Sequence, residues 1–338
     1  MKTASTHKKW LDKHGHWAHF THRDVMRRNR PKRARAELPK TVPPTTLPVD
    51  CSGNATCSWP MDGNDTLGDC GLAMCDHLDG TRSFGQGKAG FSEVVADVAT
   101  LEAQYEKVSG GDNGTDEDML VGSAGVWTAA GGGLAGNPKA VVVDHLDIDL
   151  TNGPLVQYCI DQFYGVCMAW SVPDDFLQNF ATGASFLAAD TPNPANGHFT
   201  PLTDVDEGGN NRCVTWGSWC WVGPAFIASV DPEGFVTFSA LQFNAQGYDS
   251  HGRHVSDVAA AWVALGGNAS LVNPVVASLP PKAAPTPTPA PATSGVTLAQ
   301  AQAWAAAGIA GGDPLQTQEQ ATANAASGLA ASWPTAAS

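Results

Sequence analysis

The chain has 338 residues, enough for one or two domains with a sizeable core, and 33 Asp and Glu against 19 Lys and Arg give it a formal net charge of −14. This acidic balance argues against nucleic-acid binding by the body of the protein, because such binding depends on neutralising phosphates with Lys and Arg. No run of about eighteen apolar residues occurs, so we expect a soluble protein without a membrane span.

Residues 1–46 form a basic arm with a Pro-rich end. Residues 1–40 hold twelve of the nineteen Lys and Arg residues. The arm lacks the apolar run of a secretory signal. Its histidines have no Cys or carboxylate at a familiar ligand spacing, so we favour a solvated basic arm over a metal site. A docking segment for a larger assembly and a propeptide-like extension both remain open. The histidines are His14, His16, His19 and His22.

The body, residues 47–278, has helical patterns early and strand patterns late. This segregation is typical of an α+β fold, which we expect to have an early helical lobe, a late antiparallel β lobe and a cleft between them. Helices are predicted over 70–79, 91–107, 116–130, 153–164 and 255–265, and strands over 140–144, 165–171, 198–206, 212–216, 225–230 and 234–238.

Two acidic runs invite a calcium site. Neither 112–118 nor 144–149 matches the twelve-residue calcium loop with its fixed Gly and terminal Glu. The run DHLDID at 144–149 alternates apolar and acidic residues, as an edge strand with a solvated acidic face does. We therefore expect no metal and no cofactor.

The C-terminal part begins with a Pro-Ala-Thr linker over 279–295, which is typical of an extended, semi-rigid spacer. Residues 296–338 contain two Ala-rich helical patterns separated by GGDP. Two helices of this length are marginal alone in water, so we expect a small helical hairpin that docks on a partner or on the body. A solvated tail is the alternative.

Eight cysteines raise the question of the redox compartment. Without a secretory signal, reduced thiols are the default. If the protein leaves its cell by lysis or in a virion, Cys51 with Cys57 and Cys213 with Cys220 are close enough in sequence to be bridged. Cytoplasmic synthesis and a virion-associated location are both open.

Cys70 closes the run GNDTLGDCG and precedes a predicted helix. A thiol attacks a carbonyl as the thiolate, which a helix N-terminus and a nearby imidazole stabilise. His198, in NGHFT, and Trp216, in CVTWGSW, follow far along the chain. These residue types are compatible with a nucleophile at Cys70 and a base at His198.

This order of residues resembles that of papain-like cysteine proteases. That family carries a Gln whose amide helps to bind the oxyanion six positions before the Cys, and Asn64 stands there in this sequence. Trp216 and Gly217 follow His198 at the family separation. The resemblance implies that Cys70, His198 and Asn64 are catalytic and that Trp216 is the shield.

Further segments extend the resemblance over about 47–250, and they are closer to a divergent bacterial and phage group than to the cathepsins. LPVD at 47–50 resembles the start of a mature papain-like domain. GDNGTDEDML at 111–120, with Gly114, resembles the loop and helix that line the peptide cleft. The segment from Gly153 resembles the helix and strand that enter the second lobe.

One position departs from the family. Val214 stands where papain-like enzymes have the Asn that orients the His, and valine cannot accept the imidazole N–H. We expect Thr215, Asp204 or Asp206 to take that role, or packing alone to hold the ring. Loss of an orienting group costs orders of magnitude in rate without abolishing catalysis.

Two functions are compatible with these residues. The first is a cysteine peptidase or amide hydrolase that acts on a peptide or on a peptidoglycan cross-link. The second is a papain-fold binding protein or phage virion protein whose chemistry is impaired, which Val214 and the terminal extensions favour.

Overall fold

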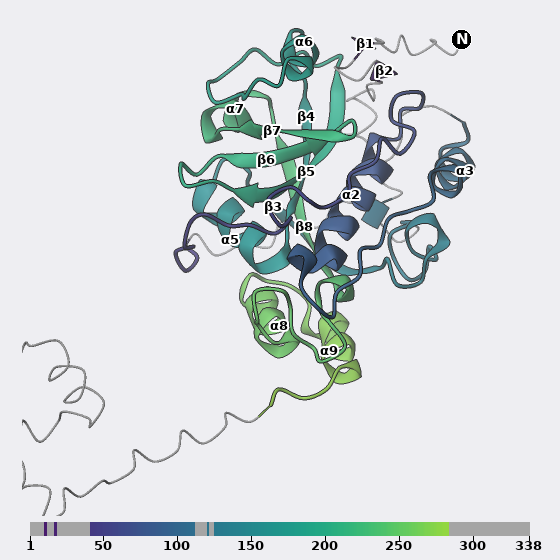
Figure 1. The fold of residues 1–338 in the computed structure, drawn as a ribbon, viewed down its shortest axis with the longest axis vertical. Coiled ribbons are helices and arrows are strands. Elements are labelled where there is room, and N and C mark those ends of the chain that lie inside the picture. The colour runs from purple at the N-terminus through teal and green to yellow at the C-terminus, as the bar shows by residue number, and fades with distance from the viewer. Residues whose placement is uncertain (1–9, 12–16, 19–40, 112–119, 122–124, 284–338) are drawn as a thin grey trace, which may run out of the picture. The chain divides into compact units, whose positions relative to one another are not determined.

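Figure 1 shows the fold as a computed structural model, which describes residues 10–11, 17–18, 41–111, 120–121 and 125–283. The chain divides into two units, Met1–Lys282 and Ala283–Ser338. Of the second unit only Ala283 is described, so the predicted hairpin over 296–338 and most of the linker lie outside the described residues. In the arm, β1 (Trp10–Leu11) pairs antiparallel with β2 (Trp17–Ala18).

A six-stranded antiparallel sheet forms the centre of the first unit. Its strand order is β3-β8-β4-β5-β6-β7. The bounds are β3 (Val142–Ile148), β4 (Val166–Ser171), β5 (Gly197–Val205), β6 (Asn211–Thr215), β7 (Ser218–Val222) and β8 (Glu233–Ser239).

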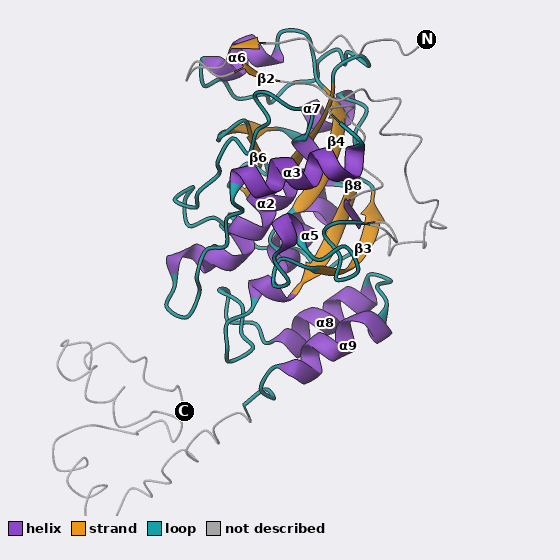
Figure 2. Ribbon diagram, turned by 90° about the vertical axis from the view of Figure 1, so that its right-hand side faces the viewer, coloured by secondary structure: helices purple, strands orange, loops and turns teal. Residues whose placement is uncertain are grey.

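Helices complete a mixed helix and antiparallel-sheet fold, with α2 and α3 near one another and α8 beside α9 (Figure 2). The helices are α2 (Cys70–Phe84), α3 (Val98–Ser109), α5 (Gly153–Phe163), α6 (Phe176–Ala181), α7 (Pro224–Ser229), α8 (Val255–Ala264) and α9 (Ala269–Ser278), with short 3₁₀ turns at η1 (Gly85–Gly87), η2 (Leu134–Gly136) and η3 (Ala240–Gln242). Within the described residues, no helix has the length and apolar character needed to cross a bilayer.

The sheet has an apolar cluster on each face. Along β4, Met168 and Trp170 belong to the cluster that includes α5 and α8, whereas Cys167 and Ala169 belong to the cluster that includes α2 and α3. Successive strand residues point to opposite faces, so a fully buried strand needs apolar residues throughout. The unbroken apolar run of β4 meets that need.

The predicted elements differ from the structure in informative places. The helix expected over 91–107 begins only at Val98, where the Asp97 side chain accepts from Thr100 N as an N-cap. Within the helix expected over 116–130, Leu120 and Val121 are helical and 125–130 form turns.

The strand expected over 225–230 is wrong, because these residues form most of α7. A short apolar run cannot be assigned from periodicity alone, and Pro224 in the first turn favours a helix. The structure also contains α6, β7 and α9, which the sequence patterns did not indicate.

Most of the acidic run DHLDID lies in β3, an edge strand as expected, but its carboxylates are not all solvated: Asp144 is buried, Asp147 is half-buried and Asp149, just after the strand, is exposed. Asp144 is buried and accepts hydrogen bonds from Trp262 Nε1 at 2.9 Å and Asn268 N at 2.8 Å. The carboxylate therefore fastens the α8–α9 pair to the sheet.

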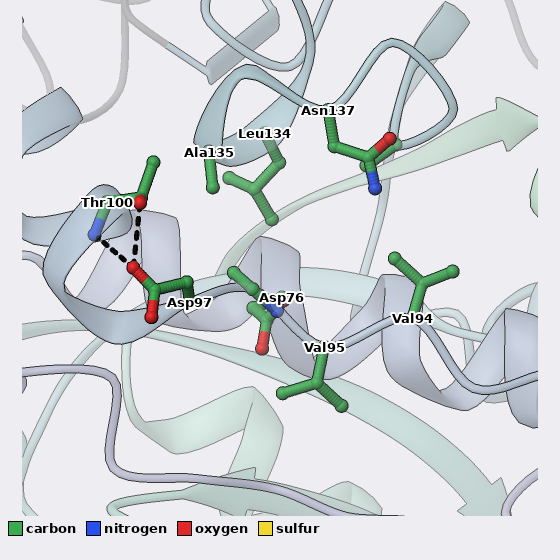
Figure 3. A pocket seen from close by; sticks show the side chains of 10 residues that line it. Asp76, Val94, Val95, Asp97, Thr100, Leu134, Ala135 and Asn137 are labelled. Atoms are coloured by element: carbon green, nitrogen blue, oxygen red, sulfur yellow. Dashed lines mark hydrogen bonds between the residues drawn. The ribbon is translucent and has the colours of Figure 1, made fainter.

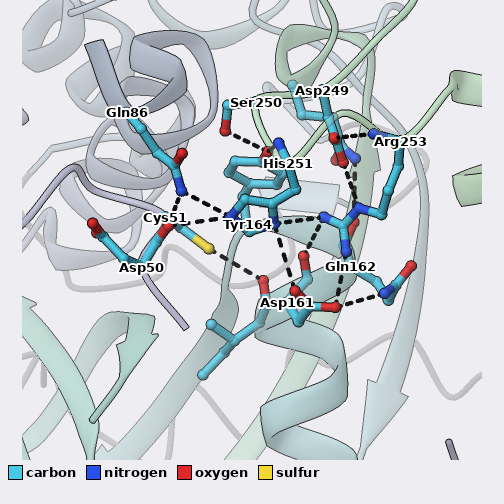
Figure 4. Close-up of polar contacts among 12 residues, drawn as sticks. Asp50, Cys51, Gln86, Asp161, Gln162, Tyr164, Asp249, Ser250, His251 and Arg253 are labelled. Carbon is cyan, nitrogen blue, oxygen red and sulfur yellow. Dashed lines mark hydrogen bonds and ion pairs between the residues drawn. The ribbon is translucent and has the colours of Figure 1, made fainter. Parts of the chain in front are cut away.

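A second polar cluster fastens the loop before α8 to the end of α5 (Figure 4). Arg253 donates to Asp161 Oδ2 at 2.8 Å and to Asp249 Oδ2 at 2.7 Å. The His251 ring stacks on Tyr164, with centroids 5.1 Å apart, and its Nε2 lies 3.2 Å from the Asp50 carbonyl. Segments from both ends of the body thus meet here.

Arg82 fixes α2 against the sheet from inside the core. Its Nη2 donates to Thr237 O at 2.8 Å and its Nε to Phe163 O at 3.2 Å. Asp79 lies 3.6 Å from Nη1 and accepts from Trp127 Nε1 at 2.7 Å. Burial raises the pKa of Asp79 to about 6, against the opposing effect of Arg82.

We predict that Arg82→Met lowers the free energy of unfolding by about 3–5 kcal/mol, because it leaves the Asp79 carboxylate buried without its cation. Adding Asp79→Asn should recover part of this loss. Urea unfolding measures both. Lys282→Met is the control, since its ion pair with Asp257 is solvent-exposed and worth at most about 1 kcal/mol. An equal loss in the single and double variants would contradict the assignment.

Candidate functional site

Cys70 is the first residue of α2. Asp69 precedes it at the N-cap with φ −96° and ψ 23°, and its side chain makes no capping hydrogen bond. Cys70 is 1% exposed and belongs to the apolar cluster that also holds Ala169 and Phe199. The thiol thus lies at a helix N-terminus, where the helix dipole favours negative charge.

Asn64 lies next to this helix start. It is buried in the turn that begins after Met61, and its Nδ2 donates to Asp69 Oδ1 at 3.3 Å. The amide is therefore close to the residue that precedes Cys70, and it is occupied by the Asp69 carboxylate. Gly114, the predicted cleft residue, lies outside the described residues.

His198 lies on β5, the strand against which α2 packs. The helix packs closely on the sheet. At Gly165, directly before β4, a Cβ would lie 2.5 Å from Leu78 Cδ1 of α2, so glycine suits this position. His198 pairs with Trp170 across β4 and is fully buried. It shares a face of β5 with Thr200, whereas its neighbour Phe199 packs in the cluster of Cys70.

Thr215 and Trp216 hold the His198 ring. The Thr215 Oγ1 lies 2.6 Å from His198 Nε2 in a hydrogen bond, and the Trp216 indole stacks on the imidazole with centroids 4.3 Å apart and an interplanar angle of 11°. Trp216 and Gly217 form the tight turn between β6 and β7, with φ +46° and +67°. This turn sets the indole over the ring.

Val214 points away from His198 because neighbours along β6 alternate between faces. It packs with Cys57 and Trp59 instead. The other two predicted partners of His198 are engaged elsewhere. Asp204 accepts from Cys51 N at 2.6 Å and pairs with Arg212 at 3.0 Å, and Asp206 accepts from Asn210.

The electrostatic state of His198 follows from its burial. Burial, followed by the positive charge of His77, lowers its pKa to about 3. Burial also opposes the charging of His77, but the hydrogen bond to Asp62 and its negative charge outweigh this and raise the His77 pKa. At neutral pH the His198 imidazole is therefore uncharged in this arrangement.

The predicted site residues come from two parts of the fold, the start of α2 and the sheet. Asn64 and Asp69 lie at the start of α2 with Cys70, and His198 lies with Thr215 and Trp216 on the sheet. Four buried ionisable residues follow Cys70 along α2, and the sequence patterns did not indicate them as part of a site. Several charged residues in one otherwise apolar helix would have been the sequence feature that points to them. They are Asp76, His77, Asp79 and Arg82.

All eight thiols are reduced in this structure. Cys213 and Cys220 are partners across β6 and β7. In the part of the chain that the structure describes, no group of three or more His, Cys, Asp or Glu side chains is arranged to hold a metal ion.

Solved structures similar to this chain include the following two. One is xylellain, a cysteine protease from Xylella fastidiosa, with 11% identity and a TM-score of 0.41 over 69% of this chain and 98% of that one. The other comes from work on the mite allergens Blo t 1 and Der p 1, with 12% identity and a TM-score of 0.41 over 64% of this chain and 77% of that one. No protein-family model and no curated protein matches the sequence. Similarity at this level establishes neither family nor activity.

We predict that His198 stays uncharged down to about pH 3 in the folded protein. Because the unfolded chain takes up this proton near pH 6.5, the folded state loses stability as the pH falls from about 6.5 to about 3, by at most about 5 kcal/mol. His198→Gln should remove this part of the slope in urea unfolding.

The ring-proton NMR signal of His198 gives a direct measurement, with the urea-unfolded chain as reference. A titration midpoint near 6.5 in the folded protein would contradict the burial argument.

Proposed function

We propose that the chain is a papain-like cysteine peptidase or amide hydrolase, with Cys70 as nucleophile and His198 as general base and acid. The main support for the proposal is the way the His198 ring is fixed. Thr215 Oγ1 forms a hydrogen bond with Nε2, and the Trp216 indole stacks on the ring. Orienting an imidazole by a hydrogen bond on one ring nitrogen is the geometry of a catalytic base, which acts through the other nitrogen.

In the proposed reaction the Cys70 sulfur forms a bond to a peptide carbonyl carbon, and His198 Nδ1 takes the thiol proton. The oxyanion accepts hydrogen bonds from the Asn64 amide and the Cys70 backbone N–H. His198 then protonates the leaving amine, and a water molecule hydrolyses the thioester. The substrate class is a polypeptide or a peptidoglycan cross-link.

The closed arrangement requires an opening step before catalysis. Cys70, Asn64 and His198 are all buried, and the Asn64 amide is bound to Asp69. Since burial is the main cause of the low His198 pKa, hydration would return that pKa toward its ordinary value. Opening of the buried site would therefore admit the substrate and, in the same step, raise the pKa of His198 toward that of a working general base.

A second candidate function is a binding or virion structural protein on the same fold. The burial of Cys70 at 1% exposure favours it. In this case the site residues contribute to the core and no covalent intermediate forms.

The domain division remains part of the proposal, with 1–46 as arm, 47–278 as body, 279–295 as linker and 296–338 as hairpin. The end of α9 at Ser278, directly before the linker, supports the second boundary, between body and linker. We propose the arm and the hairpin as the segments through which the protein would join a larger assembly.

We predict that iodoacetamide at neutral pH labels Cys70 at least about tenfold faster than any other cysteine, because an imidazole-activated thiol has a larger thiolate fraction. Cys70→Ala should abolish the fast phase, and His198→Gln should slow it. Cys167→Ala is the matched control, since Cys167 is a buried member of the same cluster and burial raises its pKa. Peptide mass mapping over time measures the sites.

Uniform slow labelling of the eight cysteines would reject the peptidase and favour the binding protein. Loss of peptidase activity on casein or cell wall in Cys70→Ala, with retention in Cys167→Ala, would complete the assignment.

We also predict that Thr215→Val lowers kcat/KM by about 10- to 1,000-fold, because the ring loses its orienting hydrogen bond. Thr215→Ser should keep most of the activity. Val214→Asn should restore nothing to Thr215→Val, since position 214 faces Cys57 and Trp59. Equal activity of the Val and Ser variants would show that packing alone holds His198.

A further inference from the structure

Residues 59–62, which we name the support segment, contact both α2 and the tight turn that carries Trp216. A Cβ added at Gly217, the second residue of that turn, would lie 3.6 Å from Trp59 O and 3.7 Å from Met61 N. These are ordinary van der Waals distances, so the turn rests directly on the backbone of the support segment. In a close-packed interior, a shift of this segment would therefore move the turn, and with it the indole that stacks on the candidate base.

His77 connects α2 to the support segment. Its Nε2 lies 2.7 Å from Pro60 O, in a hydrogen bond that the carbonyl accepts, and 3.3 Å from Asp62 Oδ2. His77 and Asp62 are both buried, so the loss of either partner would leave a polar group unsatisfied away from water. Asp62 also has φ +58°, which a non-glycine residue rarely adopts without support from its surroundings. The imidazole supplies that support.

A second contact fastens the other end of the support segment to the same helix. Trp59 Nε1 donates to Thr81 Oγ1 at 3.2 Å, and Thr81 Oγ1 donates to His77 O at 2.8 Å. His77 and Thr81 are four residues apart, so they lie on one face of α2. Because Cys70 begins this helix, one element positions the candidate nucleophile and, through the support segment, the indole over the candidate base.

Core filling alone does not explain a histidine at position 77. Burial opposes the charging of this imidazole, whereas an apolar side chain of similar volume would need no polar partner. The positive charge of His77 also contributes to the low pKa of His198, so the two rings lie close enough to interact. The polar contacts of His77 therefore indicate a role in the arrangement of the site.

We propose that His77 is a positioning residue for His198. It holds the support segment, the segment supports the Trp216–Gly217 turn, and the turn keeps the indole stacked on the imidazole. In the proposed reaction, His77 acts through these neighbours and not on the reacting atoms. This inference rests on the proposed function and deepens it, because it names the residue that holds the general base, but its main test does not require activity.

The test is the ring-proton NMR signal of His198, identified by its absence from His198→Gln. A stacked indole displaces this signal from its position in the urea-unfolded chain, so the displacement measures the stacking. We expect His77→Leu, which has no donor for Pro60 O, to reduce the displacement by at least about half. His77→Gln should keep most of it, because its amide can place a donor near the Nε2 position.

Ser83→Ala is the matched control. Ser83 is also a buried residue of α2, but its Oγ accepts from Val94 N at 2.7 Å, in the segment before α3. This variant should leave the His198 signal at its wild-type position. An equal change in Ser83→Ala and His77→Leu, or an unchanged signal in folded His77→Leu, would overturn the proposal.

Two measurements cover a His77→Leu protein that fails to fold. His77→Asn keeps a polar side chain that is too short to reach Pro60 O, and it should reduce the displacement in the same way. In the wild-type protein, the Gly217 Hα protons should show a nuclear Overhauser effect with Met61, since a Cβ on Gly217 would lie 3.9 Å from Met61 Cα. Absence of this effect would overturn the path through the support segment.

Kinetics on casein separate this inference from the proposed function. In an active wild-type protein, we expect His77→Leu to lower kcat at least about tenfold and to change KM less than about twofold, because a misplaced base weakens the transition state. His77→Gln should keep most of the activity. Full activity in a His77→Leu protein whose His198 signal has moved would overturn the positioning role. An inactive wild-type protein with the NMR change present would support that role and reject the proposed peptidase alone.

Discussion

The structure depends on how charge is buried along α2. This helix carries Asp76, His77, Asp79 and Arg82 in the core. A buried charge loses its hydration, so each of these side chains needs a polar or charged partner to offset the desolvation free energy. Arg82 meets carbonyls of α5 and β8, and His77 lies 3.3 Å from Asp62. These contacts leave one register for the helix on the sheet, and that register sets where Cys70 lies.

The sequence could predict the elements whose patterns are long and regular. The start of α2 at Cys70 and the strands β4, β5 and β6 lie close to the expected ranges, and β4 has the plainest signal because it is an apolar run that follows a glycine. For the residue that orients His198, the sequence indicates three candidates, which are Thr215, Asp204 and Asp206. Neighbouring residues of a strand face opposite sides of the sheet, so only one of Val214 and Thr215 can reach His198. The structure shows that it is Thr215, directly before the Trp216–Gly217 turn.

Other features depend on tertiary contacts that no local pattern contains. Asp144 is polar in sequence, yet Trp262 and Asn268, more than a hundred residues later, satisfy it in the core. The segment 225–230 has the composition of a strand and forms α7 because Pro224 starts a turn there. A cavity lined in part by Asp76 likewise needs two distant segments, around Val95 and Leu134, to meet beside α2 (Figure 3).

The two candidate functions differ in one physical variable, the hydration of His198. Removing water lowers the pKa of an imidazole and favours its neutral form, which suits a core residue that stacks on the Trp216 indole and lies beside the tilted Trp170 ring. A general base needs a pKa nearer the working pH. In a peptidase with this site, part of the free energy of substrate binding would therefore have to drive the hydration of the His198 ring. In such a peptidase the hydrogen bond between His198 Nε2 and Thr215 Oγ1 would keep the ring oriented while the packing around it opens, with Nε2 as the donor so that Nδ1 is free to accept the thiol proton.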